Sequence, residues 1–327
     1  MSTEINNIKN ATIDKDTLEL LITAFQLYEI AKLDNNVYRK DENLQIPKNL
    51  IEQYYKRIKP NYNNMIYNFR RKYVSNELLV EKNDSPEERK GLNLVYDYIQ
   101  NFDVDKDYFN IFASSLVIHS LLYRPLDEMN ASGISEIKEE ALRLKDEAKK
   151  EKSLEKLKRA QELLRNVQYE KFGGQLRKGA VVLRDFNVDI PDAEEAMYLF
   201  NSYLSPEKIK EYEEALNNPD IFAYIDYAVN TTADLIGMQP FGDGNKRAFR
   251  SLLNLMFKKK NLPPVYITRK ERKAYHEALE KALSEHDYSD LDAFYYYKIC
   301  DSIYELDFQT YLNSSEKDNK NKKIYTI

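Results

Sequence analysis

Cysteine is almost missing from this chain, since Cys300 is the only one among 327 residues. A single cysteine excludes a disulfide within the chain and fits a reducing compartment. The sequence also has no apolar run long enough to cross a bilayer, and its first residues lack the charged and apolar regions of a secretory signal. We therefore expect a cytoplasmic protein without a membrane partner.

Positive charge is not in excess either. The formal net charge is −5 at pH 7, and the short basic run 258–260 lies at the end of an expected helix. This balance argues against a nucleic-acid partner. The three histidines do not have the spacing of a metal site. His119 lies in an apolar helical run, which favours a core position, whereas His276 and His286 lie in or after a charged helix, which favours the surface.

Glycine is scarce, and its distribution is uneven. Of the eight glycines, six fall in two segments: Gly173, Gly174, Gly179, Gly237, Gly242 and Gly244. Because glycine gives the backbone access to conformations that other residues avoid, the chain concentrates its freedom in these two places.

The remaining composition indicates a globular, mainly α-helical protein with a sizeable core. We expect an N-terminal helical extension over 1–72, a main domain over 73–310 and a disordered tail over 311–327. Within the main domain, apolar residues recur at coiled-coil spacing in 134–167, which predicts a charged helical hairpin or one long helix. This insertion either packs on the body or forms a contact arm for a target or a second subunit, so a homo-oligomer is possible.

The segment 239–250 (QPFGDGNKRAFR) carries the most chemistry, and it joins expected helices over 221–238 and 245–260. Gly242 and Gly244 allow a tight loop, and the amides at the start of the second helix form an anion site. Arg247 and Arg250 are three residues apart and project from one face of that helix. Asp243 is an acceptor for a hard cation such as Mg²⁺. The pattern indicates a site that holds phosphates.

This segment resembles the signature of the Fic (Fido) family, His-x-Phe-x-(Asp/Glu)-Gly-Asn-(Gly/Lys)-Arg followed by an arginine three residues later. Every position matches except the first, where Gln239 replaces histidine. Further segments agree in relative position, so the resemblance covers roughly 73–305. It implies a helical bundle with a small β-hairpin flap, and transfer of an adenylyl or related group from ATP to a Ser, Thr or Tyr hydroxyl of a target protein.

The resemblance also implies a role for each position of the motif. Asp243 would hold the Mg²⁺ that bridges the phosphates, and Arg247 would stabilise phosphate charge. Phe241 would anchor the loop in the core, while Arg250 would hold the distal phosphate. The anion pocket would be lined by Gly242, Gly244, Asn245 and Lys246. Such chemistry depends mainly on positioning and electrostatics.

Two segments outside the motif complete the resemblance. The segment 173–191 resembles the flap, in which Gly174, Arg177, Val181 and Val182 would present the target. The segment 79–83 (LVEKN) faintly resembles the inhibitory helix of some members, whose glutamate pairs with the last motif arginine. Glu81 would be that glutamate, although Glu77 stands where the inhibitory pattern prefers Ser or Thr.

Gln239 stands where the family has its general base. A carboxamide can orient a hydroxyl, but it does not accept a proton at physiological pH as imidazole does. Loss of a general base costs about 10² to 10⁴ in rate. Three interpretations are open: a pseudoenzyme that binds nucleotide, an enzyme that uses another base, and a substitution introduced to trap a complex.

Lys246 adds an alternative chemistry, because many adenylylating members have glycine there. The small toxin kinase Doc resembles this chain at that position, which favours transfer of a terminal phosphate. We prefer adenylyl-type transfer because Gly244 and the long upstream region differ from the short toxin. Phosphotransfer, and a non-catalytic binding module controlled by nucleotide, are the alternatives.

Overall fold

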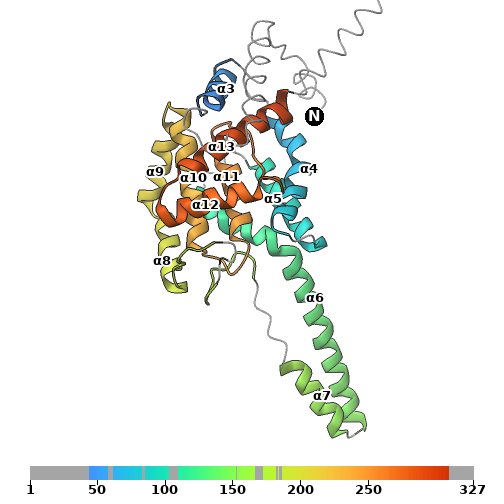
Figure 1. The fold of residues 1–327 in the computed structure, drawn as a ribbon. Helices are drawn as coiled ribbons and strands as arrows, with labels where there is room; N and C mark the ends of the chain where they lie inside the picture. The colour runs from blue at the N-terminus through green and yellow to red at the C-terminus, as the bar shows by residue number, and fades with distance from the viewer. Residues whose placement is uncertain are drawn as a thin grey trace, which may run out of the picture.

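The structure is a computed structural model that describes residues 44–57, 62–82, 85–102, 110–151, 153–165, 172–181, 183 and 186–308. Within these ranges the regular structure consists of eleven α-helices, α3 to α13, and two short helical turns, without a strand (Figure 1). The prediction of a mainly α-helical fold is confirmed. Most of the N-terminal extension and the tail over 311–327 lie outside the described residues.

The centre of the body consists of two helices that follow each other in sequence and pack together, α10 (Ile221–Met238) and α11 (Asn245–Lys259). α11 is enclosed on almost every face, because its apolar residues are not confined to a single stripe. Its buried apolar residues are Ala248, Phe249, Leu252, Leu253, Leu255, Met256 and Phe257. The N-terminus of this central helix is therefore held firmly in place.

The other helices surround this pair (Figure 1). The helices that pack against α10 are α8 (Ala193–Tyr203), α9 (Pro206–Asn217), α12 (Arg272–Glu285) and α13 (Ser289–Ser302). The elements that pack against α11 on its other side are α5 (Pro86–Asn101), α6 (Ser114–Glu151) and the turn η4 (Ile111–Ala113). The outer elements are α3 (Gln45–Arg57), which packs on α13, and α4 (Tyr62–Val80), which packs on α5 and on the π-helical turn η5 (Ile303–Phe308).

Local sequence explains where several of these helices begin. Ser85, Asp192, Ser205 and Asp220 each accept a hydrogen bond from a backbone N–H in the first turn of the helix that follows. Such caps satisfy donors that have no partner within the helix. The cap at Ser85 matters most for the site, because it fixes the start of α5 beside α11.

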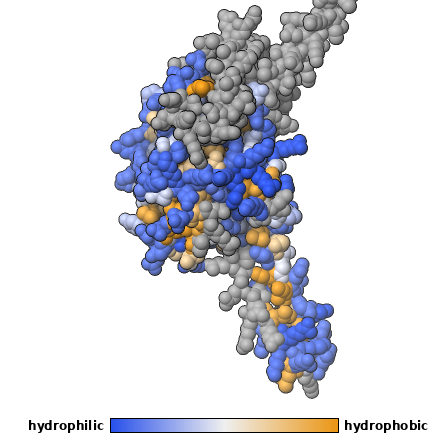
Figure 2. Space-filling model, viewed as in Figure 1, coloured by the Kyte–Doolittle hydropathy of each residue, from blue (hydrophilic) through white to orange (hydrophobic). Residues whose placement is uncertain are grey.

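The second half of α6 leaves the body, and α7 (Leu154–Arg165) folds back along it to make a helical arm (Figure 1). Ala141 and Leu144 pack against Ala160 and Leu163 to form a small core of its own. The sequence left a hairpin and a single helix open for 134–167, and the structure has the hairpin. Figure 2 shows apolar patches on the arm among hydrophilic ones, and Leu154 is 74% exposed.

Two predictions about chain organisation differ from the structure. The boundary proposed between residues 72 and 73 falls inside α4, which continues without a break from Tyr62 to Val80. The flap was expected to be a β-hairpin. The described residues of 173–191 instead form an extended loop that makes one isolated antiparallel bridge, between Leu176 and Phe241. Among its described residues, the bridge of this loop is with the motif, and the backbone hydrogen bonds within the loop are those of short turns, such as the one from the Phe186 N–H to the Leu183 carbonyl.

None of the helices in the described ranges combines the length and the apolar character that a bilayer crossing needs.

The crossing of α5 and α6 depends on Gly91. A Cβ atom at this position would lie 2.0 Å from the carbonyl oxygen of Leu122, so Gly91→Ala must push the two helices apart. We expect a loss of about 1 to 3 kcal/mol in the free energy of unfolding, as measured by urea denaturation. The matched control is Gly133→Ala in the arm, where no atom lies within 4 Å of the added methyl. There, helix propensity predicts a gain of roughly 0.5 to 1 kcal/mol. Equal effects at the two positions would contradict the close crossing.

Candidate functional site

The site is built on the loop between α10 and α11. α10 ends at Gln239, whose φ of 46° is left-handed, and α11 begins after Gly244, whose φ is 75°. A Cβ atom on Gly244 would lie 2.8 Å from the ring of Tyr123, so both the backbone conformation and the space favour glycine there. Gly244 offers no side chain to the N–H groups of the first turn of α11. This helix start therefore keeps the character of an anion site.

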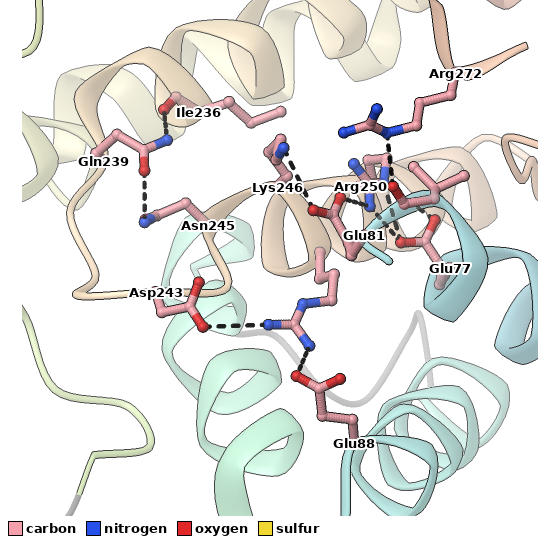
Figure 3. A network of polar contacts seen from close by, with 12 residues as sticks. Glu77, Glu81, Glu88, Ile236, Gln239, Asp243, Asn245, Lys246, Arg250 and Arg272 are labelled. Carbon is pink, nitrogen blue, oxygen red and sulfur yellow. Dashed lines mark hydrogen bonds and ion pairs between the residues drawn. The ribbon is translucent and has the colours of Figure 1, made fainter. Parts of the chain in front are cut away.

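Asn245 holds the loop closed. Its side-chain oxygen accepts a hydrogen bond from the N–H of Phe241 at 2.9 Å, and its amide nitrogen donates to the carbonyl of the same residue at 2.9 Å. The amide nitrogen also donates to the side-chain oxygen of Gln239 at 3.0 Å (Figure 3). Gln239 in turn donates to the carbonyl of Ile236 at 2.5 Å. The Gln239 carboxamide is thus 6% exposed and bonded at both ends.

Phe241 fixes the loop to the core. Its ring is fully buried, and it stacks on the ring of His119 with centroids 3.9 Å apart. Phe249 of α11 and Phe200 of α8 complete its surroundings. The motif loop therefore has one apolar anchor that points away from solvent.

One face of α6 holds the motif loop and the loop 172–192 together. His119, Tyr123 and Asp127 are spaced by four residues, which places them on one face of a helix. His119 donates from Nε2 to the Asp243 carbonyl and accepts at Nδ1 from the Gly174 N–H, each at 2.9 Å. Because Nδ1 accepts, the ring is neutral and its proton is on Nε2.

The other two residues of this face bind one loop each. The hydroxyl of Tyr123 donates to Oδ2 of Asp243 at 2.7 Å. The carboxylate of Asp127 accepts the backbone N–H groups of Phe172 at 3.0 Å and of Gly173 at 2.9 Å. The face of α6 thus positions both loops that bound the site.

The arginines of α11 are buried and paired with acids (Figure 3). Arg250 donates to both carboxylate oxygens of Glu77, with a shortest distance of 2.6 Å, and to Glu81 at 2.6 Å. Arg247 donates to Glu88 at 2.7 Å and to the hydroxyl of Tyr123 at 3.0 Å. The three acids come from the end of α4 and the start of α5.

Two further contacts complete this charge network. The ammonium of Lys246 lies 3.3 Å from Glu81, and Arg247 lies 3.5 Å from Oδ2 of Asp243. Burial opposes the charge of Glu81, but Arg250 and Lys246 outweigh it and lower the pKa of Glu81 to about 2. Burial also works against the charge of Arg250, yet Glu77 and Glu81 raise its pKa well above the usual value. Glu81 and Arg250 are therefore both charged at neutral pH.

A cavity of about 670 Å³ opens beside this network. Its walls are the motif loop and the first turn of α11, the acid Glu81, and the loop 172–192. The lining residues are Glu81, Ala180, Val181, Leu183, Gln239, Gly242, Asp243, Gly244, Asn245, Lys246 and Arg247. This volume is in the range of small-molecule and cofactor sites.

Asp243 is the exposed acid of the cavity, with 70% of its side chain accessible. Its Oδ2 accepts from Tyr123, whereas Oδ1 has no hydrogen-bond partner among the described residues. A carboxylate oxygen in this setting suits Mg²⁺ that also binds phosphate oxygens. The described residues contain no group of three or more His, Cys, Asp or Glu side chains that could hold a metal ion.

Arg177 lies in a different setting from the target contact that was predicted. Its side chain is 8% exposed, and its guanidinium donates to the carbonyls of Gln239, Gly179, Pro191 and Asp192. Its backbone N–H donates to the Pro240 carbonyl at 2.9 Å. Arg177 therefore ties the loop 172–192 to the motif.

The other predicted residues of that loop divide into three cases. Val181 lines the cavity and is half-buried. The N–H of Gly174 is bound to His119. Val182 lies outside the described residues.

Sequence reasoning missed three residues of the site, Tyr123, Asp127 and Glu88, and gave a fourth, Glu77, no role. Tyr123 and Asp127 carry a signal, because with His119 they repeat every four residues, which is the spacing of one helix face. Glu88 is the last residue of a Ser-x-x-Glu capping pattern that begins at Ser85, so the sequence indicates its place at a helix start. The sequence does not indicate the partner of Glu88, because Arg247 is 159 residues away. Glu77 was noticed only as a departure from the inhibitory pattern.

His119 makes the stability of the site depend on pH. Burial lowers the pKa of His119 to about 4, although the Asp243 carbonyl opposes the shift. In the unfolded chain the pKa of His119 is near 6.5. Between about pH 4 and pH 6.5 the unfolded chain therefore binds more protons than the folded protein, so acidification in this window lowers the free energy of unfolding. From about pH 7.5 to about pH 4.5, the unmodified chain should lose roughly 2 to 3 kcal/mol relative to His119→Asn in urea denaturation.

The comparison between the two proteins isolates this one histidine. Other groups that titrate in the window, such as Asp292, whose pKa burial raises to about 8, are common to both and cancel in the difference. Above pH 7.5 the difference should be constant. Equal pH slopes for the two proteins would refute the neutral, buried imidazole.

Comparison with known proteins finds two similar curated proteins of the same name. No family model matches the chain. It is 31% identical over 110 residues to a protein adenylyltransferase Fic from Nematostella vectensis, which covers 33% of this chain and 23% of that protein. It is 32% identical over 76 residues to a protein adenylyltransferase Fic from Aedes aegypti, which covers 23% of this chain and 15% of that protein.

A solved structure of Fic-1 (aa134–508) from C. elegans superposes with a TM-score of 0.47 at 15% identity, over 83% of this chain and 70% of that chain. The matches span less than a quarter of the length of the two curated relatives. Over these segments the chain is similar to proteins named protein adenylyltransferase Fic, and glutamine stands at the first position of its motif.

Proposed function

We propose that this protein binds a magnesium nucleotide in the cavity beside the first turn of α11 and transfers an AMP group from ATP to a hydroxyl of a target protein. The observation that carries the proposal is the convergence of Lys246, Arg247 and an exposed Asp243 on one cavity of nucleotide size. Cations, helix amides and one free carboxylate oxygen are the groups that bind a polyphosphate and its metal.

Each part of the site would have a distinct role. Bound Mg²⁺ would hold phosphate oxygens and withdraw charge from them, with Asp243 as its protein ligand. Arg247 would stabilise charge on the phosphate that is transferred, and Arg250 would bind the distal phosphate once Glu81 has moved. Tyr123 would keep Asp243 and Arg247 aligned through its two hydrogen bonds. Positioned charges of this kind supply most of the rate in phosphate chemistry.

Gln239 limits this activity. Its carboxamide is held by Ile236 and Asn245, so it supports the loop and removes no proton from an incoming hydroxyl. His119 does not replace the missing base, because it is fully buried and both ring nitrogens are hydrogen-bonded. We therefore expect transfer at a rate roughly 10² to 10⁴ lower than that of a site with histidine.

Two observations favour alternative functions. Lys246 lines the cavity with its ammonium next to Glu81, which supports a kinase-type transfer of the terminal phosphate. The bonded state of Gln239 supports a non-catalytic module in which nucleotide controls binding to a partner, with the arm of α6 and α7 as the contact surface.

The nature of the target, the cytoplasmic location and a homo-oligomer stay predictions.

The loop 172–192 is suited to present a target. Ala180 is exposed beside the cavity, and Val181 is half-buried there. Ala180 and Val181 belong to neither a helix nor a strand, so their backbone groups could pair with an extended segment of another protein. Arg177 holds this backbone against the motif, so a paired target would lie close to Gln239.

Restoring histidine should restore transfer. We expect Gln239→His, incubated with α-labelled ATP, Mg²⁺ and a cell lysate, to label a protein band that the unmodified chain labels weakly or not at all. Arg247→Ala in the Gln239→His background should abolish the label. A band labelled only from γ-labelled ATP would favour phosphotransfer. MgATP binding by the original chain, with no transfer by the histidine variant, would favour the binding module.

Removing the Glu81 carboxylate should take one of its two acids from Arg250 and one acid from Lys246, which leaves more of their positive charge for phosphate. Since a hydrogen bond to a charged group is worth about 1.5 to 3 kcal/mol, we expect Glu81→Gly to bind MgATP roughly tenfold more tightly or better in calorimetry. Leu79→Ala is the control, because this exposed side chain lies on the same stretch and touches neither cation. Unchanged affinity in Glu81→Gly would remove the regulatory role of Glu81.

A further inference from the structure

The end of α4 and the start of α5 form a corner that carries three acids, Glu77, Glu81 and Glu88. The Ser85 hydroxyl accepts a hydrogen bond from the Glu88 N–H at 3.1 Å. This cap fixes the first turn of α5 and with it the backbone of Glu88. On the other side, Arg272 donates to the carbonyl of Val80 at 2.8 Å and holds the end of α4. The corner is therefore fixed on both sides, by its own cap at Ser85 and by Arg272 of α12.

The acids of the corner form ion pairs with different arginines of the motif. Glu77 and Glu81 bind Arg250, and Glu88 binds Arg247 (Figure 3). The structure gives Glu88 no contact with Arg250, and it gives Glu81 no ion pair with Arg247. The Arg247–Glu88 pair is well shielded, with side chains 7% and 15% exposed. Two separate ion pairs thus link the corner to the site, both within the described residues.

We propose that Glu88 is a second acidic latch, which occupies Arg247 in the nucleotide-free protein and must leave it when a phosphate binds. The inference rests on the proposed function, because it takes the cavity to be a nucleotide site. It assigns to Glu88 a role separate from that of Glu81, since each acid neutralises a different arginine.

The geometry indicates that this latch is the weaker of the two. Only one oxygen of Glu88 is bonded to Arg247, and the other, Oε2, is buried without a hydrogen-bond partner in the described part of the chain. An unsatisfied buried carboxylate oxygen is costly, so the desolvation of Glu88 offsets part of its attraction to Arg247. Arg250, in contrast, is gripped by both oxygens of Glu77 and by Glu81.

Arg247 has other partners that stay in place when Glu88 leaves. The Tyr123 hydroxyl lies 3.0 Å from one of its terminal nitrogens, and its guanidinium carbon lies 5.7 Å from the centre of the Tyr123 ring. Tyr123 therefore keeps the guanidinium beside the cavity, and loss of Glu88 exposes a donor to a ligand rather than releasing the whole side chain. A phosphate oxygen would replace the carboxylate oxygen at that donor.

A matched pair of substitutions in one helical turn tests the latch. Glu88→Gln removes the charge that faces Arg247, and Glu87→Gln removes a charge from the same first turn of α5 without a bond to Arg247. In calorimetry we expect Glu88→Gln to bind MgATP about 5- to 20-fold more tightly. The gain reflects the charged hydrogen bond that the nucleotide no longer has to break, reduced by the desolvation that offsets part of it. Glu87→Gln should stay within about twofold, because Glu87 is only partly buried and has no ion pair with Arg247, so that solvent screens its charge.

Two further measurements locate the effect at the phosphates. Adenosine, which has no phosphate, should bind Glu88→Gln and the unmodified chain equally. In the double variant Glu81→Gln, Glu88→Gln, the gains in MgATP affinity should multiply, because the two acids act on different arginines. Equal affinities for MgATP in Glu88→Gln and Glu87→Gln, with a gain in Glu81→Gln, would overturn the second latch while leaving the proposed function intact.

The failure of the proposed function looks different, since then none of the four variants binds MgATP. Thermal unfolding without nucleotide shows whether each variant folds. If Glu88→Gln does not fold, Glu88→Asp decides, because it keeps the charge but withdraws the carboxylate by one methylene. Its MgATP affinity should also rise, and an affinity equal to that of the unmodified chain would overturn the latch.

Discussion

The pairing between the buried arginines of α11 and the acids of the α4–α5 corner is the interaction on which the rest of the structure depends. Arg247 and Arg250 are 6% and 4% exposed, and a buried charge without a partner is strongly destabilising. The acids therefore make it possible for a central helix to begin with two arginines. The same guanidinium groups are the ones a phosphate would bind, so the contacts that stabilise the folded body are also contacts that a ligand must replace.

The site itself is assembled by α6 rather than by the motif alone. The motif loop is short, and most of its polar side chains point inward to brace it, as Asn245 and Gln239 do. What aligns this loop with the loop 172–192 is the shared face of α6 that carries His119, Tyr123 and Asp127. Because α6 packs against both α5 and α11, one helix relates the positions of the acids, the cations and the two loops.

The sequence predicts the mainly helical fold and the position of the motif loop, because helical periodicity and glycine placement are local properties. It also shows the segment that becomes the arm, although not that it folds back. Contacts such as Glu88 with Arg247 and Asp127 with Gly173 were beyond reach, since they depend on how distant helices pack. The hairpin expected at 173–191 illustrates the same limit: alternating residues such as Val181 and Leu183 indicate extended chain, but they do not say which backbone the chain pairs with.

The arm and the site share one helix, and this has a mechanical consequence. From Asp127 to Glu151, α6 extends roughly 36 Å at 1.5 Å per residue. Pro125 lies between Tyr123 and Asp127 and contributes no N–H to the helix, so bending is easiest at that point. Tyr123 holds Asp243 on one side of this joint, and Asp127 holds the backbone at Gly173 on the other. A load applied at the tip of the arm would therefore act as on a lever, and it would strain the gap between the two loops.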